Sequence, residues 1–374
     1  MRIGLDGRGI RPEPDGIGRY TQQLIRSVVA AFPDSEMVVW CLSSGLSSVP
    51  SLPQIRSIVC NHHHLTRFTV QRFGKQINAA ELDLFHSPFF LAPVMTRCPL
   101  LVTVHDLMAL EIPEFFDESS PLVAWYKRSF HRRYVPRSLQ AAYRVLPVSR
   151  WVAQRVEAQG VRRENIRILP NAVDILFSNT STGSDVENLR SLGLRPGFFL
   201  HVGRWKRYKN LPLLLEAYQR YIARTSREPI DLVLCRGGGG DRRVEMVLDR
   251  LQLRDRVKIV QQVPDRLLPT LYRAASAVLQ PSLCEGFGLP VVEAMACGTP
   301  AVCSDAGALP EVCGDAALIV DSTSSEAWAA ALEQLASDQD LRSQLRSKGI
   351  GHSAIYRPEQ MTKNIAAIYK EVVQ

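Results

Sequence analysis

Residues 281–300 constrain the fold of this 374-residue chain more than any other stretch. They lie between two short apolar runs and contain Gly286, Gly288 and Pro290. Proline suits the first turn of a helix because its missing N–H would have no partner there, and a glycine closely followed by a proline, as at 298–300, ends a helix. The pattern therefore predicts strand, glycine turn, helix and strand, with the helix over residues 290–297.

Two glutamates belong to this turn and its helix. Glu285 and Glu293 are eight positions apart. Glycine lets the backbone approach a ligand closely, and the N–H groups at a helix start attract an anion such as a phosphate. Carboxylates accept hydrogen bonds from hydroxyl groups and repel a bare phosphate, so we expect a ligand that carries both. The alternative is an ordinary βαβ unit with one surface glutamate and one helix glutamate.

The length of the chain predicts two domains, because single cores rarely grow beyond about 250–300 residues. Its 46% hydrophobic content is typical of a globular protein. No run reaches the ~18 apolar residues of a membrane span. Residues 1–6 lack the apolar core of a signal peptide, so export is not expected. The eight cysteines form no Cys-x-x-Cys pair, which favours reduced thiols and a cytoplasmic protein.

The net charge of +8 is unevenly spread, since residues 119–156 hold eight Lys or Arg and no acidic residue. Leu122, Tyr126, Phe130 and Tyr134 recur every four positions there, which predicts an amphipathic basic helix. Two interpretations stay open. The aromatic stripe packs into the core, or the helix rests on an anionic membrane surface. Nucleic acid is not an expected partner, because no binding motif accompanies the charge.

The segment Glu285-Gly-Phe-Gly-Leu-Pro-Val-Val-Glu293 closely resembles the signature of the family 4 retaining glycosyltransferases. In that family the first glutamate faces the donor sugar and the second usually holds the ribose of the nucleotide. The resemblance implies these roles for Glu285 and Glu293. It also implies further donor contacts from the residues between them, namely Gly286, Phe287, Gly288 and Leu289.

Two sites in the first half extend the resemblance. Strand 2–6, a glycine loop and helix 17–29 make a candidate anion cradle, and residues 15–19 resemble the family's loop that touches the donor pyrophosphate and the acceptor. Gly16 is the residue expected to allow close approach of the backbone to the ligand.

His105 and Asp106 follow strand 100–104, at the edge where open α/β sheets bind ligands. The alternative is a helix cap by Asp106. The family's histidine at this position contacts the donor sugar, which implies that role for His105.

A basic turn, residues 204–210, follows the predicted strand 198–203 in the second half. Arg binds phosphate through two N–H groups and Lys as a point charge, so Arg204 and Lys209 are candidates to neutralise a pyrophosphate. The alternative is a solvated charge cluster, and Lys206 and Arg207 are expected to face solvent. The family reads the nucleobase near residue 263, which implies a base contact by Val263.

Two patterns superficially indicate a metal site. Consecutive histidines at 62–64 point in alternate directions on an extended segment, so they cannot share one ion, and a polar loop edge is expected. Asp338-Gln-Asp340 resembles an Asp-x-Asp metal motif, but it lies between two helical patterns and no strand precedes it. We predict a helix cap there.

Alternating strands and helices predict an α/β fold with parallel sheets covered on both faces. The resemblance implies GT-B: two Rossmann-like domains facing a cleft, over residues 1–177 and 178–355. It also implies a last helix, 356–374, that crosses back to the first domain. The polar stretch 178–185 is the expected linker.

The resemblance implies a retaining transfer of a hexose from a nucleotide-diphosphate sugar to a hydroxyl acceptor, without a cofactor or metal and with no assigned protein nucleophile. Residues 16–19, 85–88 and 103–107 look most like bacterial mannosyltransferases that use GDP-mannose to build polysaccharides or lipid-linked glycans, lipopolysaccharide among them. A UDP- or dTDP-sugar donor, a GT-B sugar-nucleotide epimerase and an inactive sugar-binding protein are the alternatives. The expected location is the cytoplasm, with contact at the inner face of the membrane left open.

Overall fold

The computed structural model describes residues 1–12, 16–63, 66–116, 119–181, 183–237 and 241–373. The chain forms two compact units. One consists of Met1–Ala172 together with Pro358–Gln374, and the other of Val173–Arg357. The chain therefore leaves the first unit before the boundary expected at residue 177, and the polar stretch 178–185 belongs to the second unit.

The first unit is built on a parallel sheet with the strand order β3-β2-β1-β4-β5-β6. All of its strands except β3 are buried along almost their whole length, because helices cover both faces. The order reverses between β1 and β4, and loops after such a pair of strands commonly bind ligands. The strands are β1 (Arg2–Asp6), β2 (Glu36–Cys41), β3 (Ile55–Val59), β4 (Leu84–Ser87), β5 (Leu100–Val104) and β6 (Arg144–Pro147).

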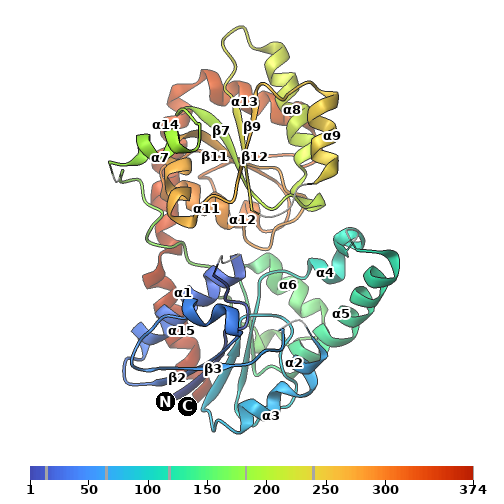
Figure 1. Ribbon diagram of the computed structural model, residues 1–374, viewed down its shortest axis with the longest axis vertical. Coiled ribbons are helices and arrows are strands. Elements are labelled where there is room, and N and C mark those ends of the chain that lie inside the picture. The colour runs from blue at the N-terminus through green and yellow to red at the C-terminus, as the bar shows by residue number, and fades with distance from the viewer. Residues whose placement is uncertain (13–15, 64–65, 117–118, 182, 238–240, 374) are drawn as a thin grey trace. The chain divides into compact units, whose positions relative to one another are not determined.

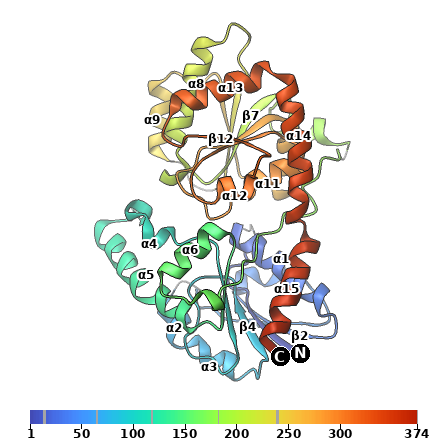
Figure 2. The same cartoon turned by 180° about the vertical axis from the view of Figure 1, so that it is seen from behind.

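The last helix of the chain packs beside the first helix in this unit (Figures 1 and 2). Met361, Ile365, Ile368 and Val372 are buried in one core with Leu24 and Val28 of α1. The helices are α1 (Gly16–Ala31), α2 (Arg67–Gln71), α3 (Phe73–Asn78), α4 (Met108–Glu111), α5 (Pro121–Ala141), α6 (Arg150–Ala158) and α15 (Pro358–Val373). The 3₁₀ turns in the described part of this unit are η1 (Ser43–Ser48), η2 (Pro113–Phe116) and η3 (Arg163–Asn165).

The second unit repeats the same topology. Its parallel sheet has the order β12-β11-β10-β7-β8-β9, so the reversal lies between β7 and β10. The strands are β7 (Phe198–Gly203), β8 (Leu232–Arg236), β9 (Val257–Gln261), β10 (Ala275–Gln280), β11 (Ala301–Ser304) and β12 (Leu318–Val320). The predicted α/β class with parallel sheets is confirmed in both units.

Helices cover both faces of the second sheet (Figure 1). Of these, α8 packs against α13, and α11 packs against α14. They are α7 (Asp185–Ser191), α8 (Leu211–Arg224), α9 (Arg242–Arg250), α10 (Leu268–Ala274), α11 (Leu289–Ala296), α12 (Leu309–Cys313), α13 (Ser325–Ser337) and α14 (Gln339–Ser353). The 3₁₀ turns are η4 (Arg207–Lys209), η5 (Asp265–Leu267) and η6 (Ala354–Tyr356).

Two predictions on helices have clear outcomes. Asp338 caps α14 as predicted, since its carboxylate accepts a hydrogen bond from Leu341 N at 2.8 Å. The aromatic stripe of α5 packs into the core only in part: Phe130 and Tyr134 are buried, whereas Leu122 and Tyr126 are exposed. The exposed residues lie at the start of the helix, and periodicity alone could not show where its cover ends.

The buried face of α15 should stabilise the first unit. Replacing Ile365 by Ala removes a fully buried side chain from the core. We expect a loss of about 2–5 kcal/mol in the free energy of unfolding, measured by urea denaturation. Lys363 lies on the exposed side of the same helix, and Lys363→Ala should change this free energy by less than about 0.5 kcal/mol. Equal effects of the two variants would contradict the placement of α15.

Candidate active site

The candidate site lies at the carboxyl ends of β7 and β10, which are neighbours at the reversal of the second sheet. The loop after β10 carries Glu285 and leads into α11, which begins one residue earlier than predicted. Gly288 precedes α11 with a φ of +98°, and a Cβ there would lie 2.5 Å from Leu309 Cδ2. Only glycine fits this position without strain.

A second glycine supports the Glu285 loop from a distance in sequence. Gly307 has a φ of +66°, and a Cβ on it would meet the backbone oxygen of Glu285 at 2.4 Å. The same oxygen accepts a hydrogen bond from Ala308 N at 2.8 Å. The segment before α12 therefore fixes the backbone of Glu285, a role that the sequence pattern did not predict.

Three donors converge on one oxygen of the Glu285 carboxylate. Lys209 Nζ, Gln280 Nε2 and Ser282 Oγ each lie 2.6 Å from Oε1. Among the residues that the structure describes, Oε2 has no donor within hydrogen-bond distance. One oxygen is thus held in place, and the other is left to accept a hydrogen bond from a ligand.

Glu285 is 8% exposed, and burial by itself raises the pKa of a carboxyl group. The Lys209 ammonium and the hydrogen bonds from Lys209, Ser282 and Gln280 act in the opposite direction and prevail. The pKa of Glu285 is therefore below its ordinary value, and the group is ionised at neutral pH.

The basic turn after β7 divides into a buried part and an exposed part. Lys209 ends η4, is buried, and makes the 2.6 Å ion pair with Glu285. Arg204 and Arg207 are exposed, and Lys206 is half-buried. The structure therefore brings Lys209 to Glu285, whereas Arg204 stands at the surface directly after the strand.

His201 of β7 is a further residue of this cluster that the sequence did not single out. It is fully buried, and its Nδ1 lies 2.9 Å from Leu279 O, to which it donates a hydrogen bond. Burial lowers the pKa of His201 to about 4, so the ring is neutral and Nε2 is an acceptor. Nε2 has no partner in the described part of the chain, and it lies 3.6 Å from where a Cβ on Gly203 would be.

Other residues of the 285–293 signature are also buried. Glu293 is buried on α11, and its Oε2 accepts a hydrogen bond from Tyr272 OH at 2.8 Å. The Phe287 ring packs edge-on against Tyr356, so only its backbone remains for a ligand. Gly286 is also buried. The N–H groups of Gly288 and Leu289 have no acceptor among the described residues, as expected at a helix start.

His105 follows β5 in the first unit and is half-buried. The ring of Tyr20 from α1 packs edge-on against it at 4.5 Å. Asp106 Oδ1 accepts a hydrogen bond from Met108 N, at the first residue of α4, at 3.1 Å, but the N-cap of α4 is Leu107, whose side chain makes no capping bond. Gly16 is exposed at the start of α1, where a Cβ would meet nothing, and Asp15 lies outside the described residues.

A buried hydrogen-bond chain holds Tyr20 in place. Tyr20 OH bonds to Thr103 Oγ1 at 2.9 Å, which bonds to His86 Nε2 at 2.8 Å. His86 Nδ1 in turn bonds to Tyr369 OH of α15 at 2.8 Å. Burial lowers the pKa of His86 to about 3, so this ring is neutral. These residues lie far apart in sequence, and no motif connects them.

The remaining sequence candidates lie in separate places. Val263 is half-buried and follows β9 by two residues. It lies near the carboxyl end of β8, because Gln262 N donates a hydrogen bond to Arg236 O, in the last residue of β8, at 3.1 Å. Four consecutive glycines, 237–240, follow β8 in the sequence, and residues 238–240 are not among those described.

The consecutive histidines have different partners. The ring of His62 stacks on Phe68, with ring centroids 3.8 Å apart, whereas His63 Nε2 accepts from Arg11 at 3.4 Å. His64 lies outside the described residues. Among the described residues, no three His, Cys, Asp or Glu side chains are grouped closely enough to hold a metal ion.

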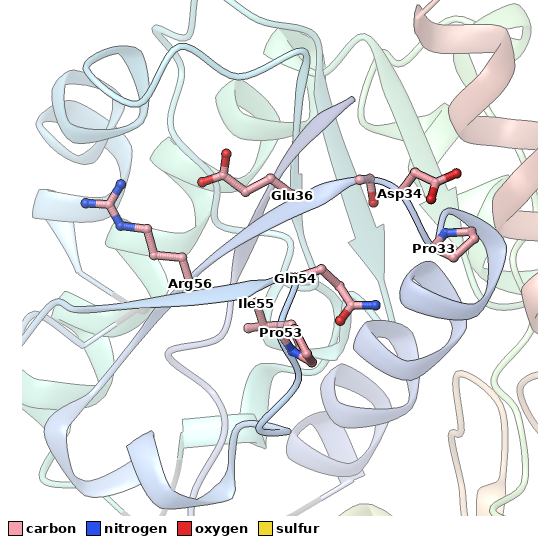
Figure 3. Close-up of a pocket in the computed structure, with 8 residues that line it drawn as sticks. Pro33, Asp34, Glu36, Pro53, Gln54, Ile55 and Arg56 are labelled. Carbon is pink, nitrogen blue, oxygen red and sulfur yellow. The ribbon is translucent and has the colours of Figure 1, made fainter.

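A hollow of about 730 Å³ opens elsewhere, at the amino-terminal ends of β2 and β3 (Figure 3). Asp34, Glu36 and Arg56 contribute its charged side chains. All candidate residues follow the carboxyl ends of strands instead. The hollow therefore lies at the opposite edge of the first sheet from His105 and has no part in the candidate site.

Two family models match the chain, one described as "Glycosyltransferase Family 4" over residues 14–176 and the other as "Glycosyl transferases group 1" over residues 188–352. The chain belongs to the family 4 and group 1 glycosyltransferases. The match favours a glycosyltransferase over the epimerase that the same architecture allows. It also places the Glu285–Lys209 cluster within the group 1 segment and His105 within the family 4 segment.

The glycosyltransferase has relatives of similar length. O-antigen chain mannosyltransferase B of Escherichia coli is 29% identical over 99% of this chain and 100% of its own. D-inositol 3-phosphate glycosyltransferase of Corynebacterium urealyticum is 32% identical over 59% of this chain and 54% of its own.

Solved structures share its fold. Sucrose-phosphate synthase from Thermosynechococcus elongatus superposes with a TM-score of 0.77 at 20% identity, covering 99% of this chain and 98% of its own. WaaG, a glycosyltransferase involved in lipopolysaccharide biosynthesis, has a TM-score of 0.73 at 14% identity, over 98% and 99% of the two chains. HepE of Anabaena, in complex with UDP and glucose, has a TM-score of 0.74 at 19% identity, over 99% and 100%. The predicted GT-B class is confirmed.

In the described part of the chain, no helix is both long enough and apolar enough to cross a bilayer.

The Lys209–Glu285 pair makes a testable contribution to stability. Lys209→Met leaves a buried carboxylate without its cation, which should cost about 3–5 kcal/mol in the free energy of unfolding at pH 7. In the wild type the pKa of Glu285 is lowered, so the stabilisation is present above about pH 4.3 and is lost as the pH falls through the folded-state pKa. In the variant burial should instead raise this pKa, so the difference between the two proteins should shrink towards acidic pH.

Lys348→Met is the matched control, because its ammonium lies 2.8 Å from Asp315 in an exposed pair. It should cost at most about 1 kcal/mol. Urea denaturation at pH 7 and near pH 4 measures both variants. A pH-independent loss in Lys209→Met would contradict the assigned role of the pair.

Proposed function

We propose that this glycosyltransferase transfers mannose from GDP-mannose, with retention, to a hydroxyl of a glycan or lipid-linked saccharide in bacterial polysaccharide biosynthesis. The observation that carries the proposal is the Glu285 carboxylate, ionised and buried, with Oε1 held by three donors and Oε2 open to a ligand. Such an oxygen suits a sugar hydroxyl. The E. coli relative supports mannose and polysaccharide, since it is named an O-antigen mannosyltransferase and is similar along its whole length.

In the proposed reaction the bond between sugar C1 and the diphosphate oxygen breaks. A bond between C1 and the acceptor oxygen forms on the same face, and the leaving phosphate takes the acceptor's proton. Negative charge develops on the diphosphate, and preorganised positive groups lower the barrier by stabilising it. Lys209, Arg204 and the N–H groups of Gly288 and Leu289 would supply them. The proposal needs no metal and assigns no protein nucleophile.

The remaining roles in the proposal follow the family resemblance. Glu293 would hold the ribose, Val263 would meet the base, and His105 and Gly16 would contact the sugar and the diphosphate. The neutral Nε2 of His201 is an additional acceptor beside Lys209. Nε2 would accept a hydrogen bond from a ligand hydroxyl. It would also accept one from the Lys209 ammonium when a diphosphate draws that ammonium away from Glu285.

Glu285→Gln tests the catalytic proposal. The amide keeps the shape of the side chain but removes its charge, and turnover should fall by roughly 10²-fold, as when one preorganised polar group is removed. Product formation from GDP-mannose is measured by NMR, which also reports the anomeric configuration. Glu187→Gln, at an exposed position of α7, should retain full activity. Full activity of Glu285→Gln, with folding verified by circular dichroism, would remove Glu285 from the site.

Nucleotide binding tests the donor. A ligand that binds only the folded protein raises its stability by about 2.7 kcal/mol at 100 times Kd. GDP should therefore raise the Tm in a thermal-shift assay, and UDP, dTDP and ADP should not. A shift with UDP or dTDP alone would retain the glycosyl-transfer proposal and overturn the mannose donor. An inverted anomeric product would overturn retention.

A further inference from the structure

An exposed apolar surface lies at the start of α5 and includes none of the candidate site residues. Leu122, Val123, Trp125 and Tyr126 are 76%, 44%, 63% and 54% exposed. Single exposed apolar side chains are ordinary on protein surfaces. Four within five consecutive positions of one helix are not, and they include two large aromatic rings. We refer to these four residues as the α5 tip.

The rest of α5 anchors the tip to the first unit. Phe130, Tyr134, Val135 and Leu139 are buried, so the carboxyl-terminal half of the helix is fixed in the core. The Phe130 and Tyr134 rings pack together with centroids 4.9 Å apart. Figures 1 and 2 show α5 at the outer edge of this unit, next to α4. The α5 tip therefore belongs to a helix that is anchored in the core, and the described elements around it leave it exposed.

The charge of α5 indicates what covers the tip. The helix carries five basic residues and no acidic residue. Three of the basic side chains, Arg132, Arg133 and Arg137, are exposed and have no carboxylate within ion-pair distance among the described residues. The basic residues are Lys127, Arg128, Arg132, Arg133 and Arg137. Asp117 and Glu118 precede the helix and lie outside the described residues.

We propose that the α5 tip inserts into the headgroup region of an anionic bilayer, with the arginines of α5 facing the lipid phosphates. Trp and Tyr favour the membrane–water interface, where one part of the ring is apolar and another reaches water. An interfacial helix binds through buried apolar area together with attraction between Lys or Arg and anionic lipids. A second copy of this chain is a poorer occupant, because pairing two such helices would bring their positive charges together.

This inference goes beyond the transfer reaction and does not depend on the donor. If the acceptor is a lipid-linked saccharide, as the proposed function includes, the α5 tip would hold the enzyme at the surface where that acceptor lies. Failure of one proposal leaves the other standing, because vesicle binding requires neither donor nor turnover.

Cosedimentation of the full chain with vesicles tests the inference. The protein should bind vesicles with about 30% phosphatidylglycerol in phosphatidylcholine, bind pure phosphatidylcholine much more weakly, and be released by salt, because surface charges are screened. The double variant Leu122→Ser/Trp125→Ser should bind the anionic vesicles at least about tenfold more weakly. The triple variant Arg132→Gln/Arg133→Gln/Arg137→Gln should lose the preference for anionic lipid.

The matched control is Val186→Ser/Met246→Ser, which removes two exposed apolar side chains from the second unit. It should bind vesicles like the wild type, and all variants should keep the wild-type thermal shift with the nucleotide that binds. The inference is overturned if the wild type ignores anionic vesicles, or if the control loses as much binding as the tip variant. It is also overturned if light scattering shows that the tip variant changes only a dimer equilibrium.

Discussion

The buried contact between Lys209 and Glu285 holds the candidate site together. Each side chain is only 11% exposed, so neither charge has much water around it, and each depends on the other. Ser282 and Gln280 donate hydrogen bonds to the same carboxylate oxygen that Lys209 contacts, which leaves the second oxygen for a ligand. A charge held in this way is preorganised, since it need not change its surroundings when a sugar hydroxyl arrives.

The two parallel sheets explain why these groups meet. In the second unit the strand order reverses between β7 and β10, so the loops after these two strands diverge around one point. The loop after β7 contributes Lys209, and the loop after β10 contributes Glu285. The first unit has the same order, and His105 follows its β5, next to β4. One topology thus places chemistry-bearing loops at the carboxyl edge of each sheet.

Burial has opposite consequences in the two halves of α5. The aromatic side chains of its carboxyl-terminal half stabilise the first core, whereas the same residue types at its start remain exposed. A helix with a uniform aromatic period can therefore serve both as a structural element and as an interaction surface. Which of the two a given turn serves depends on whether another element covers it.

The sequence by itself determined the α/β class, the strands β1, β5 and β7, the glycine turn before α11 and the Asp338 cap, and it singled out Glu285 and Lys209, which the structure brings into contact. It could do so because apolar periodicity, glycine, proline and capping residues act over a few neighbouring positions. It did not predict the edge strands β3 and β12, which bury few side chains. Only the tertiary structure brought Gly307 and His201 to the site, because their contacts join segments far apart in the chain, and only it left the start of α5 uncovered.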